Sequence, residues 1–152
     1  MKLMPSNSVS PLFDRLTELP GAADNGRLLD ADGLQQSVLT DLSRLFNSRN
    51  GLTIEEFLGD RPSSLHYGLP DTLRLSPQSA ADLAQWEQVV ARALSLYEPR
   101  LTEVEVKVGP EPGKPISARI RINGAVTLGR QQRRLHFDCV LNGQAASLES
   151  AA

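Results

Sequence analysis

The stretch Tyr97-Glu98-Pro99-Arg100-Leu101 marks the point at which the predicted fold changes from helix to sheet. Before it, apolar residues recur every three or four positions, and after it they alternate with polar ones. Proline disfavours helical backbone in the residue before it, so the helix is expected to end at Glu98. The stretch therefore predicts a carboxylate and a guanidinium held on stiff backbone at a junction between helix and strand.

The first main helix is predicted over residues 34–48, with Asp32 as its N-cap. Asn50-Gly51 should end it, because both residues tolerate the left-handed conformation. Its buried face consists of apolar residues at helical spacing, namely Val38, Leu39, Leu42, Leu45 and Phe46. In the connector over residues 52–75, the spacing of proline and glycine predicts turns around one short helical piece.

The second main helix is predicted to begin at Ser76 and Pro77 and to reach the junction. Serine can cap a helix, and proline suits the first helical position because its missing N–H would be unpaired there. The buried face of this helix is predicted to contain Leu83, Trp86, Val90, Ala93, Leu94 and Tyr97.

Three half-buried strands are predicted after the junction, at about residues 104–108, 116–122 and 135–141. Each alternates apolar and polar residues, so that one face is buried and the other is open. Short connections between consecutive strands favour antiparallel pairing. The predicted fold class is therefore α+β, with two main helices packed on one face of a small antiparallel sheet.

The length of 152 residues is enough for one domain with a single core. We expect an N-terminal arm over residues 1–31, with a short helical turn at residues 12–16 that docks on its own domain or on a neighbour. Residues 32–144 are predicted to form the α+β domain. The small residues from 145 to 152 predict a flexible tail.

The composition, 40% apolar and 22% charged residues, is typical of a soluble globular protein. No apolar run approaches the roughly 20 residues needed to cross a bilayer, and the first residues lack the apolar stretch of a secretory signal. The single Cys139 excludes an internal disulfide, and its alternation with Phe137 and Leu141 predicts a buried, inert thiol. These features favour the cytosol and predict no insertion into a membrane.

Charge is distributed unevenly along the chain. Residues 1–111 carry 10 basic and 16 acidic side chains, whereas residues 112–137 carry no Asp or Glu. The basic residues of that second segment are Lys114, Arg119, Arg121, Arg130, Arg133 and Arg134. The segment is either an oriented surface for an acidic partner or an ordinary solvated sheet face. Nucleic acid is not predicted as a partner, because no aromatic residues interleave with these arginines.

No pattern in the chain predicts a catalytic, cofactor-binding or metal-binding site. It contains no phosphate-binding glycine loop and no GxSxG, HExxH or CxxC motif, and neither His66 nor His136 has a sequence neighbour suited to catalysis. Glu98 is the one candidate acid for glycoside hydrolysis, which needs a pair of carboxylates. Arg100 would keep it ionised, and no second carboxylate stands out.

Four short motifs follow one another in the chain: residues 12–16, residues 37–49, Tyr67-Gly68-Leu69-Pro70-Asp71 and Glu98-Pro99-Arg100-Leu101. Their order and spacing resemble the TssE family, the baseplate subunits of bacterial type VI secretion systems. These proteins are related to the phage-tail baseplate wedge proteins that have been labelled lysozyme-like. The resemblance spans residues 10–142, and Asn47-Ser48-Arg49 replaces the usual Asn-Thr-Arg.

The resemblance implies a structural protein rather than an enzyme, in a cytoplasmic baseplate docked at the inner membrane. It implies TssF-, TssG- and TssK-like wedge subunits and TssB/TssC-like sheath subunits as partners, with the spike hub as a further candidate. Such a protein would link the wedge to the first sheath ring and seed sheath assembly. The alternatives are a muramidase-like hydrolase that cleaves peptidoglycan through Glu98 and a free-standing adaptor for acidic proteins.

The family's Glu-Pro-Arg motif falls on Glu98, Pro99 and Arg100, which are therefore predicted to bind protein together with Arg119 and Arg121. Two mechanisms are open for Glu98 and Arg100. They could face an external partner in one groove, or Arg100 could fold back onto the carbonyls that end the second helix. We expect the first.

Overall fold

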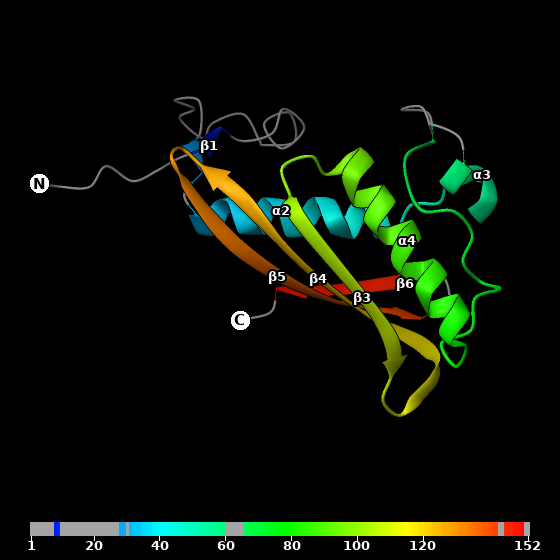
Figure 1. Cartoon of the computed structure of the whole chain (residues 1–152). Helices are drawn as coiled ribbons and strands as arrows, with labels where there is room; N and C mark the ends of the chain where they lie inside the picture. Colours follow the sequence, from blue (N-terminus) through cyan, green and yellow to red (C-terminus); the bar gives the residue numbers. More distant parts are fainter. Residues whose placement is uncertain (1–7, 10–27, 30, 60–65, 143–144, 151–152) are drawn as a thin grey trace, which may run out of the picture.

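The computed structural model describes residues 8–9, 28–29, 31–59, 66–142 and 145–150. The predicted helical turn at residues 12–16 lies outside these ranges, and so does most of the predicted arm. The described residues form an α+β fold with one main antiparallel sheet, as the alternating pattern of the C-terminal third predicts (Figure 1).

The main sheet has four strands in the order β3-β4-β5-β6, which is also their order in the chain. Their bounds are Thr102–Glu111 for β3, Lys114–Leu128 for β4, Gln131–Asn142 for β5 and Ala145–Ser150 for β6. All neighbours pair antiparallel, so the sheet is a simple meander. The short strands β1 (Ser8–Val9) and β2 (Leu28–Leu29) pair only with each other.

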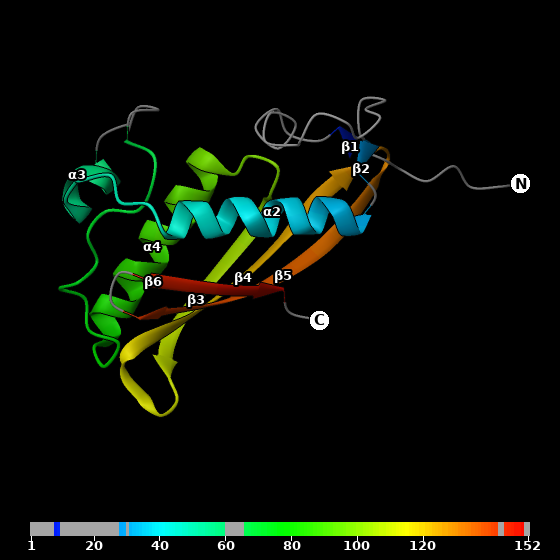
Figure 2. The same cartoon turned by 180° about the vertical axis from the view of Figure 1, so that it is seen from behind.

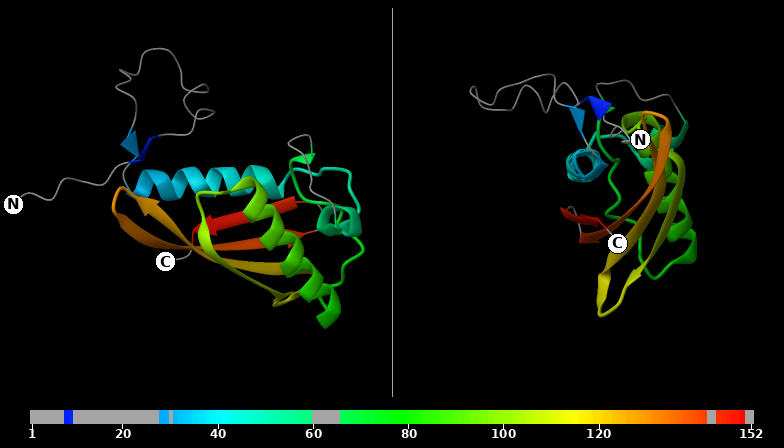
Figure 3. Two further views of the ribbon diagram at one scale, coloured as in Figure 1. Left: turned by 45° about the horizontal axis from the view of Figure 1, so that its top comes forward. Right: turned by 90° about the vertical axis from the view of Figure 1, so that its left-hand side faces the viewer.

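In the described part of the chain, three helices accompany the sheet: α2 (Ala31–Phe46), α3 (Ile54–Gly59) and α4 (Ala80–Tyr97). Helix α4 lies beside β3, and α2 lies beside β6 (Figures 1 and 2). The sheet is strongly twisted, as the edge view in Figure 3 shows. One continuous cluster of buried side chains joins α2, α3, α4 and one face of the sheet. The prediction of two main helices on a single sheet face is therefore confirmed.

Side-chain burial follows the predicted alternation. Ile120 and Ile122 of β4 are fully buried, while Arg121 between them is exposed. Cys139 of β5 lies opposite Ile120 and is also fully buried. Loss of solvent around the thiol raises the pKa of Cys139 to about 12. The structure thus confirms the prediction of a buried thiol.

We expect Cys139 to resist thiol reagents in the folded protein. At pH 8 the buried group stays protonated, and the thiolate is the reactive form. Labelling by an aromatic disulfide reagent should therefore proceed only through unfolding, and should become fast in concentrated urea. Because the chain has one cysteine, the colour change reports this position alone. Rapid stoichiometric labelling without denaturant would contradict the packing of β5.

Three predicted boundaries were wrong. Helix α4 begins at Ala80, with Ser79 rather than Ser76 as its N-cap, and the Ser79 hydroxyl accepts a hydrogen bond from the Asp82 N–H. Ser76 instead donates its own N–H to the Asp82 carboxylate at 2.9 Å. In α2, Asp32 lies inside the first turn rather than before it. The third wrong boundary is at the C-terminal end of the domain.

Residues 145–150 form the edge strand β6, not part of a flexible tail. Two polar side chains, one in α2 and one directly after it, bind this strand. The amide group of Asn47 donates to the Ala146 carbonyl at 3.1 Å and accepts the Ala146 N–H at 2.9 Å. Near the other end of α2, the Gln35 amide donates to the Ser150 hydroxyl. A short run of small residues thus gains a strand conformation from tertiary contacts, which its weak β propensity does not predict.

None of the described helices is long and apolar enough to cross a membrane.

Candidate functional site

The junction between α4 and β3 turns Glu98 into the protein. Glu98 is the C-cap of α4, and its N–H donates to the Leu94 carbonyl at 2.9 Å. The Glu98 carbonyl in turn accepts the Leu101 N–H at 3.2 Å, so the chain turns tightly around the exposed Pro99. Only 3% of Glu98 is exposed, which is unusual for a carboxylate that lacks a partner.

The partner is Arg100, two residues along the chain. Its Nε lies 2.7 Å from Oε1 of Glu98, and its Nη2 lies 2.8 Å from Oε2. Two parallel charge-assisted bonds of this kind hold both groups in one plane. The same guanidinium donates to the Ser37 hydroxyl at 3.1 Å and to Oδ2 of Asp41 at 2.6 Å. Arg100 therefore joins the junction to the middle of α2, about 60 residues earlier in the chain.

The contacts form a chain of alternating charges from Glu98 through Arg100 and Asp41 to Arg44. Oδ1 of Asp41 accepts from Nη1 of Arg44 at 3.0 Å, so both carboxylate oxygens of Asp41 are used. Burial of the guanidinium opposes its charge, but hydrogen bonding and attraction from Glu98 and Asp41 outweigh that effect and raise the pKa of Arg100. The two anions and two cations of this chain balance, so the charge of the buried Glu98 is compensated.

This geometry corrects the prediction that Glu98 and Arg100 both face an external groove. Glu98 is buried, and the side chain of Arg100 is only 27% exposed. The second mechanism, in which Arg100 satisfies the carbonyls at the end of α4, is also wrong, because the bonds of Arg100 go to Glu98 and to side chains of α2. Binding of a protein partner by this motif stays a prediction, carried by the exposed Pro99 and the open part of Arg100.

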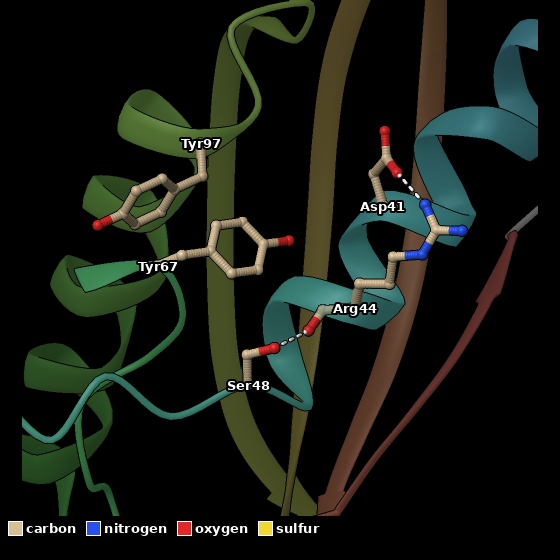
Figure 4. A pocket seen from close by; sticks show the side chains of 5 residues that line it. All are labelled: Asp41, Arg44, Ser48, Tyr67 and Tyr97. Carbon is tan, nitrogen blue, oxygen red and sulfur yellow. Dashed lines mark hydrogen bonds and ion pairs between the residues drawn. The ribbon is translucent and has the colours of Figure 1, made fainter. Parts of the chain in front are cut away.

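A cleft of about 480 Å³ opens beside this network, between the ends of α2 and α4. It is lined by Asp41, Arg44, Ser48, Tyr67 and Tyr97 (Figure 4). The two tyrosine rings meet edge to face, with centroids 5.2 Å apart and planes 68° apart. Burial and then the charge of Asp41 raise the pKa of Tyr67, so its hydroxyl stays protonated at neutral pH. The cleft thus combines aromatic surface, hydroxyl groups and charged side chains.

The loop that carries Tyr67 is fastened to the end of α2. The Leu69 N–H donates to the Ser48 carbonyl at 2.9 Å, and the Asn50 N–H donates to the Leu69 carbonyl at 3.1 Å. Gly68 lies against this contact with a φ of +119°, and a Cβ there would lie 2.7 Å from the Ser48 oxygen. Only glycine fits such an approach, so Gly68 determines how Tyr67 is presented.

Arg49 caps the C-terminal end of α2. It donates through Nη1 to the Phe46 carbonyl at 2.7 Å and to the Ser48 carbonyl at 3.1 Å, at the C-terminal end of α2. Partial burial lowers the pKa of Arg49, partly offset by the negative charge of Asp71. In the Asn47-Ser48-Arg49 motif, the side chains of Asn47 and Arg49 therefore bond to backbone carbonyls of this chain.

Arg119 and Arg121, two of the predicted basic residues, lie on the open face of the sheet, next to the buried Ile120 and Ile122. Arg119 makes two bonds to Glu111, from Nε at 2.6 Å and from Nη2 at 3.0 Å. Its neighbour Arg121 is exposed and pairs in register with Lys107 of β3. These cations line a hollow of about 210 Å³ at the β3–β4 hairpin. On its other side Arg121 pairs in register with Asp138 of β5, so Arg121 has one basic and one acidic cross-strand neighbour.

Sequence reasoning missed Ser37, Asp41 and Tyr67 as members of the site. Ser37 and Asp41 lie four residues apart, on one face of a helix, which is an available signal but one shared by many solvated pairs. In the described part of the chain, no group of three or more His, Cys, Asp or Glu could hold a metal ion. The Nδ1 atom of His136 lies 2.7 Å from Oδ1 of Asn123, which is not a catalytic nucleophile.

The chain matches a family model and a solved structure. The model of the baseplate wedge protein gp25 family matches residues 32–131. A chain from a solved structure described as the baseplate complex from the type VI secretion system shares the fold, with a TM-score of 0.51 and 21% identity. That match covers 80% of this chain and 96% of the other. No curated protein matches significantly. Because the family match spans most of the domain, from the first turn of α2 to the start of β5, this chain belongs to the baseplate wedge protein gp25 family.

Proposed function

We propose that this protein is a structural component of the baseplate of a contractile, phage-tail-like machine. The observation that carries the proposal is the family match over residues 32–131. The fold shared with a chain of a type VI secretion baseplate supports a machine of that type. The protein would link wedge subunits resembling TssF, TssG and TssK to the first ring of TssB/TssC-like sheath subunits. It would work in the cytoplasm, in a baseplate docked at the inner membrane, with the spike hub as a further neighbour.

The geometry of Glu98 argues against the alternative of a peptidoglycan hydrolase. A general acid must reach the glycosidic oxygen across an open cleft. Both carboxylate oxygens of Glu98 are bound by Arg100, and the residue is 3% exposed. A sugar could reach this carboxylate only after the junction had opened. We therefore propose that Glu98 has a structural role, which is to hold Arg100 at the junction.

Co-purification tests the proposed function directly. A tagged copy expressed from its own promoter should bring down baseplate wedge subunits, identified by mass spectrometry, and a strain lacking the gene should form no sheath. Purified protein should also leave peptidoglycan intact. Recovery of the tagged chain alone, together with normal sheaths in the deletion strain, would refute the proposal.

We expect Arg119 and Arg121 to matter for assembly more than for folding. Exposed charges add little to stability, so Arg119→Glu/Arg121→Glu should melt within a few degrees of the parent protein. Recruitment of sheath or wedge subunits should weaken, with a larger effect at low salt, where screening is weak. Lys114→Glu is the matched control, a charge reversal outside this pair. Unchanged recruitment across ionic strengths would mean that this face is merely solvated.

A further inference from the structure

Two large aliphatic side chains are exposed around the start of β4. Ile116 of this strand is 73% exposed, although the alternation of β4 predicts it on the buried face with Ile120 and Ile122. The register between β3 and β4 shifts here and leaves residues 115–117 without a partner position on β3. Leu73, in the loop before α4, is 56% exposed.

Both side chains line one small hollow, so they form a continuous patch rather than two scattered residues. The hollow measures about 30 Å³, and its wall is completed by the buried residues Thr72, Leu75, Trp86 and Leu141. Figure 1 shows the start of α4 and the β3–β4 hairpin at the end of the fold away from the α4–β3 junction. The patch is therefore separate from the network around Arg100.

Trp86 brings an unused hydrogen-bond donor to the hollow. Its side chain is buried, and its indole Nε1 has no acceptor among the described residues. A buried tryptophan N–H usually has a partner, because an unpaired donor inside a protein destabilises the fold. Since Trp86 is part of the wall, an acceptor that entered the hollow would lie beside its ring. The unpaired donor and the apolar rim are independent observations that indicate one occupant.

The backbone on both sides of the hollow is already held in place. Oδ1 of Asp71 accepts the Leu73 N–H at 2.9 Å, which fixes the turn that exposes the leucine. The side-chain amide of Gln78 donates to the Pro115 carbonyl at 3.4 Å, directly before Ile116. A surface that is ordered before binding loses less conformational entropy when a partner arrives.

We infer that Leu73 and Ile116 form a docking patch for an aliphatic side chain of a neighbouring protein, whose adjacent main-chain carbonyl accepts the indole N–H of Trp86. A hollow of about 30 Å³ has room for an oxygen but not for a side chain, so the apolar group lies on the rim. None of the described residues that line the hollow is charged. A carboxylate would lose its hydration there without gaining a cation, which favours a neutral carbonyl.

This inference rests on the proposed function in one respect, because the neighbour is taken to be a wedge subunit of the same baseplate. The chemistry of the contact follows from the patch itself. An interface of this kind has an apolar centre with few, well-placed hydrogen bonds, and a small number of such residues carries most of the binding energy.

Co-purification of variants tests the apolar part of the patch. Leu73→Asp and Ile116→Asp each place a charge on the rim and should lower the recovery of one wedge subunit about tenfold or more. Both residues are exposed, so each variant should melt within a few degrees of the parent protein. Leu96→Asp is the matched control, because this exposed leucine does not line the hollow and should leave recovery unchanged.

The outcomes separate this inference from the proposed function. Full recovery of every wedge subunit by both patch variants would overturn the inference and leave the proposed function intact. If the parent chain itself recovers no wedge subunit, the proposed function fails and the inference fails with it. A dimer of this chain that forms with rising concentration and is lost in Ile116→Asp would assign the patch to a second copy and overturn the inference.

The indole N–H is tested without changing the shape of the ring. In place of the only tryptophan, β-(3-benzothienyl)alanine carries sulfur where the N–H was. Affinity for the purified wedge subunit should fall about five- to tenfold with no loss in melting temperature, because no bond within the described chain is removed. In protein labelled with ¹⁵N-tryptophan, the single indole signal should shift when that subunit is added. Unchanged affinity with an unchanged signal would mean that a buried water holds the N–H, and would overturn the inference.

Discussion

Replacement of Arg100 by alanine is expected to lower the free energy of unfolding by about 3 kcal/mol or more, the typical loss on breaking a buried ion pair from one side. The reason is the burial of Glu98, whose two carboxylate oxygens are bound by this one guanidinium. Without it, a charge remains inside with no cation beside it. The contact to Asp41 on α2 is lost as well. Urea denaturation followed by circular dichroism measures the change.

The reverse substitution should be milder. Glu98→Ala leaves Arg100 partly exposed and still bonded to Asp41 and Ser37, so about 1 kcal/mol is expected. The double variant Glu98→Ala/Arg100→Ala should be more stable than Arg100→Ala alone, because the unpaired carboxylate is gone. Arg100→Lys keeps the charge but not the paired bonds and should lie between. Equal losses for Glu98→Ala and Arg100→Ala would contradict the asymmetry of burial. An assembly defect of Arg100→Ala therefore indicates a binding role only if the variant is still folded under the conditions of the assembly assay.

Gly68→Ala should cost about 3 kcal/mol, from a strained backbone together with a steric clash. The φ of +119° is unfavourable for any residue with a Cβ, and this Cβ would lie 2.7 Å and 2.8 Å from the carbonyl oxygen and carbon of Ser48. Those atoms belong to backbone that also bonds Leu69, so they cannot move aside cheaply. Thermal unfolding measures the loss.

Gly51→Ala is the matched control for this substitution. Gly51 also has a positive φ, +75°, but its Cβ would meet nothing within 4 Å. Strain alone should then cost about 1 kcal/mol. A loss at Gly68 no larger than the loss at Gly51 would show that the loop can shift away from α2. The emission of Trp86, which is the only tryptophan, serves as a common reporter because the residue is 4% exposed.

Local patterns predicted most of the fold. Apolar residues alternate with polar ones around Ile120, and they recur every three or four positions around Trp86. Each pattern places the apolar side chains on one face, and both faces pack on the same core. A period of two predicts a strand and a period of 3.6 predicts a helix. Pro99 ended α4 where expected, since its effect on Glu98 is purely local. The start of α4 was misplaced because Ser76 and Ser79 are both acceptable caps. They differ only in their bonds to Asp82: the Ser79 hydroxyl accepts the Asp82 N–H, whereas the Ser76 N–H donates to the Asp82 carboxylate.

The features that were missed depend on distant partners. Strand β6 has weak β propensity and is held by Asn47 and Gln35, about a hundred residues earlier. Likewise, the sequence alone predicts that Glu98 and Arg100 are exposed, because the contact of Arg100 with Asp41 is seen only in the structure. Sequence spacing alone cannot show whether two charges face water or a helix that lies far away along the chain. The family resemblance, in contrast, rested on motif order and is confirmed by the match to residues 32–131.

The two ties between α2 and β6 bear on how the protein is made. They join positions 99 and 115 residues apart, so Gln35 near the start of α2 and Asn47 just after its end can form these bonds only once β6 has been synthesised. At roughly 5 to 20 residues per second, the ribosome adds the intervening segment in about 5 to 20 s. During that interval the apolar stripe of α2 has no edge strand beside it. Final closure is therefore a late event in synthesis, and a nascent chain stalled before residue 145 should remain a substrate for chaperones long after its first helix has formed.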